Sequence, residues 1–154
     1  MKAQITLTQP QQAAANHLLE SLDTGNVVVL RGPAGSGKTT ILESIHEERG
    51  GILLGARQFV GVAKSMAPAA IEESFLRMIE DAILGHELVL ADDLQVLLNV
   101  VDNPRSYLLD AALTAILAEA GVLACKLVFA VEEAAPWPIE RRARVARIGE
   151  SRPD

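Results

Sequence analysis

Apolar residues along the chain alternate between two kinds of segment. Short runs that are apolar almost throughout, as in strands buried on both faces of a sheet, occupy residues 26–31, 52–56, 87–91 and 126–131. Longer segments with apolar residues at helical spacing predict helices over residues 8–23, 38–49, 69–84 and 105–120. Strands that alternate with helices favour an α/β fold, a three-layer sandwich in which helices cover both faces of a parallel sheet.

Local signals predict where two of the helices begin and end. Thr8 followed by Gln11 is typical of a capping box, in which each side chain binds the backbone N–H of the other residue. Gly121 follows the last apolar position of the fourth helix and is predicted to end it.

The C-terminal part of the chain is predicted to be less regular. The Pro-Trp-Pro sequence at 136–138 breaks the chain, and we expect Trp137 to anchor this loop in the core. Apolar residues alternate with arginines over residues 143–148, which predicts a fifth strand at an edge of the sheet. We expect residues 1–150 to form one domain and residues 151–154 to be a disordered tail.

The most specific motif lies between the first strand and the second helix. Residues 32–39 read GPAGSGKT and match G-x-x-x-x-G-K-[ST], the phosphate-binding P-loop. Its glycines let the backbone N–H groups surround an anion, Lys38 is expected to reach the β- and γ-phosphates, and the Thr39 hydroxyl to bind Mg²⁺. The predicted nucleotide-binding residues are Gly32, Pro33, Ala34, Gly35, Ser36, Gly37, Lys38, Thr39 and Thr40.

Two acids follow the third apolar run. Asp92 is predicted to hold Mg²⁺ through its water shell, and Asp93 to orient and deprotonate the attacking water. Acidic pairs after strands also serve as helix N-caps. Their position about fifty residues after a P-loop, at the end of a buried strand, favours the role in catalysis.

The composition of the chain bears on the cellular location of the protein and on the partners that it could bind. The chain has 154 residues, is 49% hydrophobic, and carries a net charge of −6, which disfavours a general nucleic-acid-binding surface. Five of the fourteen basic residues are arginines between positions 141 and 152, so the C-terminal end is locally basic. Cys125 is the single cysteine, which excludes a disulfide within the chain. Without a signal-peptide pattern or an apolar stretch near ~18 residues, we expect a cytoplasmic protein with no membrane contact.

The motif GPAGSGKTT at 32–40, the strand LVLADD at 88–93, a further strand and an arginine pair before the last strand resemble the core α/β domain of AAA+ ATPases. The resemblance covers roughly residues 1–150. It implies a five-stranded parallel sheet of the P-loop NTPase type with strand order 5-1-4-3-2, hydrolysis of ATP with Mg²⁺, and assembly into rings. We therefore expect a homo-oligomer, or a partner chain that completes the site.

The resemblance also implies roles for residues outside the two motifs. Glu132 lies nearest the position at the tip of the fourth strand that senses the γ-phosphate, where the family usually has Asn, Thr or Ser. Arg141 or Arg142 matches the arginine that reaches the neighbouring subunit's site, with Arg142 favoured, so the predicted catalytic residues are Lys38, Asp93 and Arg142. Asp93 replaces the usual Glu. The helical lid of the family has no counterpart, and we expect a fragment of a longer protein.

Three other functions stay open. A small P-loop kinase would transfer the γ-phosphate to a metabolite and use the arginine run at 141–147 as a lid. A regulatory module would bind nucleotide without hydrolysing it. Residues 7–12 resemble the start of superfamily 1 helicases, where a Gln reads adenine; this favours ATP over GTP, although the second motor domain of a helicase has no counterpart.

Overall fold

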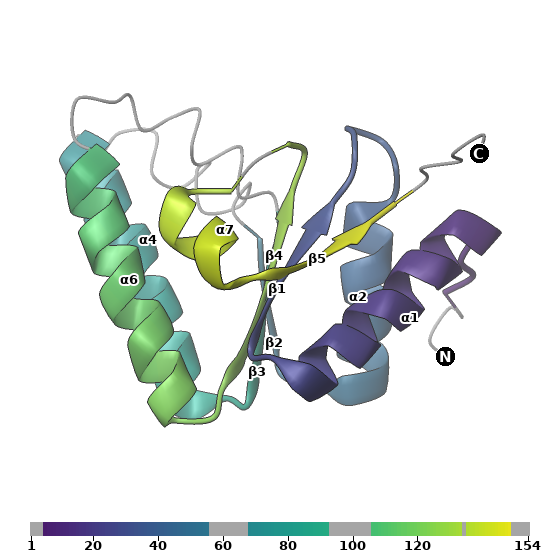
Figure 1. The fold of residues 1–154 in the computed structure, drawn as a ribbon, viewed down its shortest axis with the longest axis horizontal. Coiled ribbons are helices and arrows are strands. Elements are labelled where there is room, and N and C mark those ends of the chain that lie inside the picture. The colour runs from purple at the N-terminus through teal and green to yellow at the C-terminus, as the bar shows by residue number, and fades with distance from the viewer. Residues whose placement is uncertain (1–4, 56–67, 93–105, 134, 149–154) are drawn as a thin grey trace.

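A parallel five-stranded sheet forms the centre of the molecule (Figure 1). The computed structural model describes residues 5–55, 68–92, 106–133 and 135–148, with the backbone alone at 68–75 and 106–109. The strands are β1 (Val27–Arg31), β2 (Ile52–Gly55), β3 (Leu88–Asp92), β4 (Lys126–Val131) and β5 (Arg144–Arg147), in the order β2-β3-β4-β1-β5. Read from the other edge, this is the predicted order 5-1-4-3-2, which is thereby confirmed.

Helices cover both faces of the sheet, as the three-layer prediction requires. In Figure 1, α1 (Gln9–Thr24) and α2 (Lys38–Arg49) lie on one side of the sheet. On the other side lie α4 (Pro68–Gly85), α6 (Ser106–Val122) and the short α7 (Trp137–Arg142). Every described strand pairing is parallel, so the carboxyl ends of the strands meet at one edge of the layer, where α/β folds bind their ligands.

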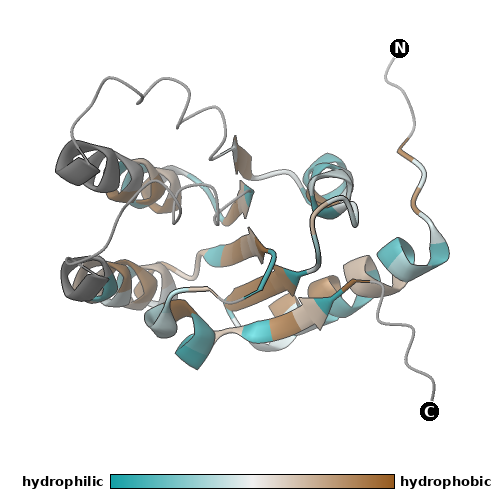
Figure 2. Cartoon of the chain, turned by 90° about the horizontal axis from the view of Figure 1, so that it is seen from above, coloured by the Kyte–Doolittle hydropathy of each residue, from teal (hydrophilic) through white to brown (hydrophobic). Residues whose placement is uncertain are grey.

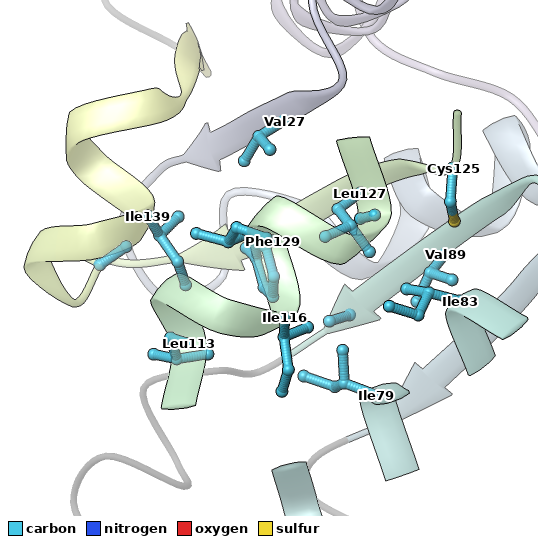
Figure 3. Packing of buried hydrophobic residues seen from close by; sticks show 14 of the residues in the cluster. Val27, Ile79, Ile83, Val89, Leu113, Ile116, Cys125, Leu127, Phe129 and Ile139 are labelled. Atoms are coloured by element: carbon cyan, nitrogen blue, oxygen red, sulfur yellow. The ribbon is translucent and has the colours of Figure 1, made fainter. Parts of the chain in front are cut away.

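Alternating side chains of the strands supply two apolar cores. Val28 and Leu30 of β1 pack toward α1 and α2, whereas Val27 and Val29 pack toward α4, α6 and α7. Phe129 of β4 is the largest fully buried side chain and lies in the second of these clusters (Figure 3). In the view from above in Figure 2, apolar residues gather on the strands of the sheet. The three central strands β1, β3 and β4 are therefore buried on both faces, as their continuous apolar runs predicted, whereas the edge strands β2 and β5 are only partly buried.

The strand β1 holds the centre of the ligand-binding edge in register. The Gly32 N–H donates to the Val131 carbonyl at 3.1 Å, and the Ile148 N–H donates to the Arg31 carbonyl at 2.9 Å. The start of the P-loop is thus fixed between the ends of β4 and β5. Residues 143–148 contain the edge strand that the alternating pattern predicted.

The fourth predicted helix, observed as α6, ends later than the glycine rule indicates. The helix continues through Gly121 to Val122, and the chain turns at Ala124, whose φ is +57°. The Cys125 N–H donates to the Ala120 carbonyl, and the Ala124 N–H to that of Gly121. These two bonds form a Schellman motif in which Ala124, rather than a glycine, adopts the left-handed conformation. The prediction that Gly121 ends the helix is wrong for this reason.

The Pro-Trp-Pro segment also differs from its prediction. Instead of only breaking the chain, it begins α7, because proline is tolerated in the first turn of a helix. Trp137 is 62% exposed and does not anchor the core; Ile139 does so, with no exposed surface. Two prolines therefore started a helix, and the apolar anchor is two residues later than expected.

Three remaining observations concern membrane spans, the cysteine and the predicted C-terminal tail. Within the described residues, no helix is both long and apolar enough to span a membrane. Cys125 is 1% exposed, and burial, with a further contribution from the charge of Glu87, raises the pKa of its thiol. A buried thiol of raised pKa is a poor nucleophile, in agreement with a core position. The predicted tail at 151–154 lies outside the described residues.

Candidate nucleotide-binding site

The P-loop leaves β1 and enters α2 within a few residues. Gly35 has φ +80° and Gly37 has φ +99°, and both values favour glycine. A Cβ at Gly32 would lie 2.6 Å from the Ser36 hydroxyl oxygen, so the close packing of the loop requires glycine there as well. The loop thus turns tightly, and the N-terminus of α2, which carries a partial positive charge, opens toward its concave side.

Lys38 is held inside this loop. Its side chain is buried, with 7% of its surface exposed, and Nζ donates to the carbonyls of Gly32 at 2.7 Å and of Pro33 at 3.0 Å. A lysine ammonium has three donor positions, and two of them go to these carbonyls. The loop therefore fixes the ammonium group at its centre, where it would meet the negative charge of a phosphate.

Thr39 and Asp92 meet across the end of the sheet. The Thr39 hydroxyl donates to Oδ2 of Asp92 at 2.7 Å, although the two residues are fifty-three positions apart in sequence. Asp92 is 6% exposed and ends β3. Leu88 and Leu90 of β3 face α1 and α2, so the alternation along the strand directs Asp92 to the face that α2 covers. The sequence predicted both residues for one task, and the structure brings them together.

The two oxygen groups are suited to a magnesium ion. Mg²⁺ keeps several waters and takes one or two protein ligands in addition to phosphate oxygens. Among the described residues no group of three His, Cys, Asp or Glu side chains gathers to hold a metal without a substrate. A hydroxyl and a carboxylate beside the P-loop agree with an ion that enters with a triphosphate. Asp93, the predicted base, lies outside the described residues.

A buried hydroxyl in the loop also agrees with a phosphate ligand. Within the described chain, Oγ of Ser36 is buried and has no hydrogen-bond partner. Buried hydroxyls are usually paired, because an unpaired one costs about 1–3 kcal/mol. Ser36 stands between Gly35 and Gly37 in the loop, so a phosphate oxygen would supply the missing partner.

One contact with the loop comes from Gln11, which was predicted to complete a capping box at the start of α1. The capping box is confirmed: the Thr8 N–H donates to Oε1 of Gln11 at 3.0 Å, and Oγ1 of Thr8 accepts from the Gln11 N–H at 3.4 Å. The Gln11 Nε2 also donates to the Ser36 carbonyl at 3.1 Å. The resemblance of residues 7–12 to helicase sequences was the only signal that could have placed Gln11 at the loop.

The predicted arginines and the predicted sensor make no contact with the loop that the described residues show. Arg141 and Arg142 are exposed in the last turn of α7, and the Arg141 guanidinium is 5.2 Å from the centre of the Trp137 ring. Neither makes a hydrogen bond or ion pair with the P-loop within the described part of the chain. Glu132 is half-buried just beyond β4, and its role as a sensor stays a prediction.

Comparisons with known proteins connect this site to a family. Residues 6–150 match the model of the AAA domain. AMPPCP-bound DnaA from Aquifex aeolicus is 17% identical at a TM-score of 0.59, with 93% of this chain and 48% of that chain covered. Domain III of the Thermotoga maritima replication initiation protein DnaA is 16% identical at a TM-score of 0.60, with 93% and 64% covered. A Walker-type ATPase of Pyrococcus abyssi is 17% identical at a TM-score of 0.59, with 90% and 53% covered.

These similarities concern the fold and part of the length of the compared proteins. Curated protein sequences give no match to the chain. The solved structures are similar in fold, and this chain spans about half the length of the DNA replication initiation factor and the Aquifex protein.

Proposed function

This chain belongs to the AAA domain family, and we propose on that basis that it binds ATP with Mg²⁺ and hydrolyses it. One observation carries the proposal: the ammonium group of Lys38 is buried inside the P-loop, and the hydrogen-bonded Thr39 and Asp92 lie beside it. The arrangement offers a fixed cation for the phosphates and two oxygen ligands for the metal. The AMPPCP in the DnaA structure supports a nucleoside triphosphate as the class of ligand.

The residues divide the chemistry between them. Lys38 and the N-terminus of α2 would hold the β- and γ-phosphates, while Thr39 and Asp92 would hold the metal. When bound, Mg²⁺ would neutralise part of the charge that develops on the transferred phosphoryl group. Asp93, next in the chain after Asp92, would orient the attacking water and accept its proton. Because its side chain is one methylene shorter than the usual Glu, we expect slow hydrolysis.

The preference for adenine is proposed from the segment before α1. Residues 7–12 resemble a segment in which a Gln reads adenine, and the Gln11 carboxamide contacts the loop through Ser36. In this proposal Gln11, which is held next to the P-loop by this bond, contributes to the preference for adenine.

A wider role is proposed from the family. Nucleotide state would change the conformation of an oligomer or of a partner chain in the cytoplasm. The exposed Arg142 is proposed to act on the site of a neighbouring subunit, because its charge would offset the negative charge of the transferred phosphoryl group.

Nucleotide binding and phosphate release test this function together. Fluorescent ATP and GTP analogues are titrated into the protein with and without Mg²⁺, and the mass of the complex is measured. We expect Mg²⁺-dependent affinity for ATP above GTP, and steady phosphate release without an acceptor. Release that needs a metabolite would favour the kinase, and binding without turnover in the assembled form would favour the regulatory module. A folded protein with no affinity for MgATP would overturn the proposal.

A further inference from the structure

An ion pair joins the residue before the P-loop to α7. Arg31 is the last residue of β1, and its guanidinium donates to Oε2 of Glu140. The alternation of β1, with Val27 and Val29 facing α4, α6 and α7, directs Arg31 to the same side. The two side chains are 18% and 28% exposed, so the pair is shielded from much of the solvent.

The same carboxylate oxygen also binds the backbone of the segment between β4 and α7. Oε2 of Glu140 also accepts from the Ala135 N–H at 2.7 Å. Ala135 lies between the tip of β4 and α7, and it is 7% exposed. One oxygen atom therefore connects the start of the P-loop, the chain that leaves β4, and the helix that carries the arginine pair.

Besides this ion pair, α7 is held by packing against α6 and β1. The helix has six residues, too few for a stable helix without tertiary contacts. Ile139 is fully buried and points into the apolar cluster around Phe129 (Figure 3). The apolar contact of Ile139 sets how deeply α7 is buried, but it does little to set the rotation of the helix about its own axis. The contacts of Glu140, the next residue, are directional and can set that rotation. Arg141 and Arg142 follow Glu140 directly in the chain, so the position of Glu140 also determines the positions of these two arginines.

We propose that Glu140 is a positioning residue that couples the P-loop to α7 through Arg31. The backbone of Arg31 is fixed between β4 and β5, so in this proposal its guanidinium and the shielded ion pair, rather than a movement of the strand, connect nucleotide binding in the adjoining P-loop to α7 and its arginines. The consequence for turnover rests on the proposed function. The attachment of α7 to β1 does not, because it is a property of the protein without nucleotide.

The single tryptophan makes this proposal measurable. Trp137 is the only tryptophan of the chain and stands in the first turn of α7, three residues before Glu140. Its fluorescence anisotropy therefore reports the local motion of α7. Glu140→Gln keeps an oxygen that can accept from the Ala135 N–H but removes the charge that holds Arg31. Glu20→Gln, at an exposed position of α1, is the matched control.

The expected result has two parts. Without nucleotide, Glu140→Gln lowers the Trp137 anisotropy and Glu20→Gln leaves it unchanged. With MgATP, the emission change of Trp137 falls by at least half in Glu140→Gln, while the Kd stays within twofold of wild type. In the assembled oligomer, where the arginines of α7 are proposed to act, kcat falls about tenfold. Arg31→Gln gives the same changes in fluorescence. The double variant Arg31→Gln/Glu140→Gln is no worse than either single variant, because the two act as a unit.

Each other result decides a separate question. Unchanged anisotropy in Glu140→Gln would show that Glu140 does not hold α7. Lower anisotropy with a full response to MgATP would overturn the coupling and keep only the attachment. No affinity of the wild type for MgATP would overturn the proposed function, and with it the coupling to nucleotide, whereas the anisotropy would still decide the attachment. Should Glu140→Gln fail to fold, as judged by circular dichroism, Arg31→Gln removes the same ion pair from the other side, and its Trp137 anisotropy decides the attachment.

Discussion

The P-loop and α7 border the same end of β1, yet they hold their charged groups in opposite ways. Lys38 is buried and its ammonium group is bonded to two carbonyls of its own loop. Arg141 and Arg142 are exposed, and the Arg141 guanidinium lies over the exposed Trp137 ring. A group that binds its ligand in every cycle gains from being fixed beforehand, because little ordering remains to be done on binding. A group that acts on another subunit must instead be free to reach it.

The first prediction removes the fixed cation. We expect Lys38→Ala to raise the Kd for MgATP at least about 100-fold, because a charge-assisted contact with the phosphates, of the order of 3 kcal/mol, is lost. Isothermal titration calorimetry measures the effect. Lys126→Ala is the control, since Nζ of Lys126 also donates to a backbone carbonyl, that of Leu22, but at the other end of β4. Equal affinity in Lys38→Ala and wild type would show that the P-loop is not the binding site.

The second prediction separates binding from turnover at the two acids. We expect Asp93→Asn to lower kcat by about 100-fold and leave the Kd within twofold, since a general base contributes roughly 10²–10⁴-fold to a rate. Asp92→Asn should instead weaken binding only when Mg²⁺ is present, because Asp92 and its hydrogen-bonded partner Thr39 are the proposed metal ligands. Titrations with and without Mg²⁺, followed by phosphate-release assays, distinguish the two. Normal hydrolysis by Asp93→Asn would place the base elsewhere.

The third prediction measures how tightly the loop is fixed, with two glycines of similar backbone conformation. A Cβ at Gly37 would lie 2.1 Å from Nε2 of Gln11, whereas a Cβ at Gly35 would meet nothing within 4 Å. Both have positive φ, so Gly35→Ala should cost about 1–2 kcal/mol of unfolding free energy from backbone strain alone. Gly37→Ala should cost roughly 1 kcal/mol more, because Gln11 must move and lose its bond to Ser36.

Urea unfolding followed by circular dichroism gives these free energies. The double variant Gln11→Ala/Gly37→Ala should cost less than the sum of the two single variants, since the clash is absent once the Gln11 side chain is removed. Equal losses for Gly35→Ala and Gly37→Ala would show that Gln11 does not constrain the loop.

The same contrast explains how far the sequence could predict the structure. The P-loop and the five strands followed from motif spacing and from continuous or alternating apolar patterns, which depend on residues close together in the chain. The strand order followed from the resemblance to AAA+ core domains. The pairing of Thr39 with Asp92 agrees with the role that both motifs predicted, binding of Mg²⁺. The contact of Gln11 with Ser36 and the ion pair of Arg31 with Glu140 join segments twenty-five and one hundred and nine positions apart. Nothing in the local pattern of either segment indicates such a contact.

The errors near α7 and α6 have a similar cause. Two prolines and a tryptophan indicated a break, but the burial of Ile139 against a neighbouring strand stabilised a helix there. A glycine indicated the end of α6, but hydrogen bonds to the carbonyls of Ala120 and Gly121 placed the turn at Ala124. Tertiary contacts and backbone hydrogen bonds decided both cases, and sequence rules weigh neither.

The last prediction concerns the exposed pair and has the smallest effect on the isolated chain. We expect Arg142→Ala to leave the Kd for MgATP within twofold and the kcat of dilute protein unchanged, because the side chain does not contact the P-loop. In an assembled oligomer, kcat should fall with Arg142→Ala but not with Arg141→Ala, whose guanidinium is engaged with Trp137. Phosphate release across a range of protein concentrations, with the mass of the complex measured at each, tests this. A loss of turnover in dilute Arg142→Ala would mean that Arg142 acts within its own chain, so exposure in α7 would not be the sign of a group that acts on a neighbour.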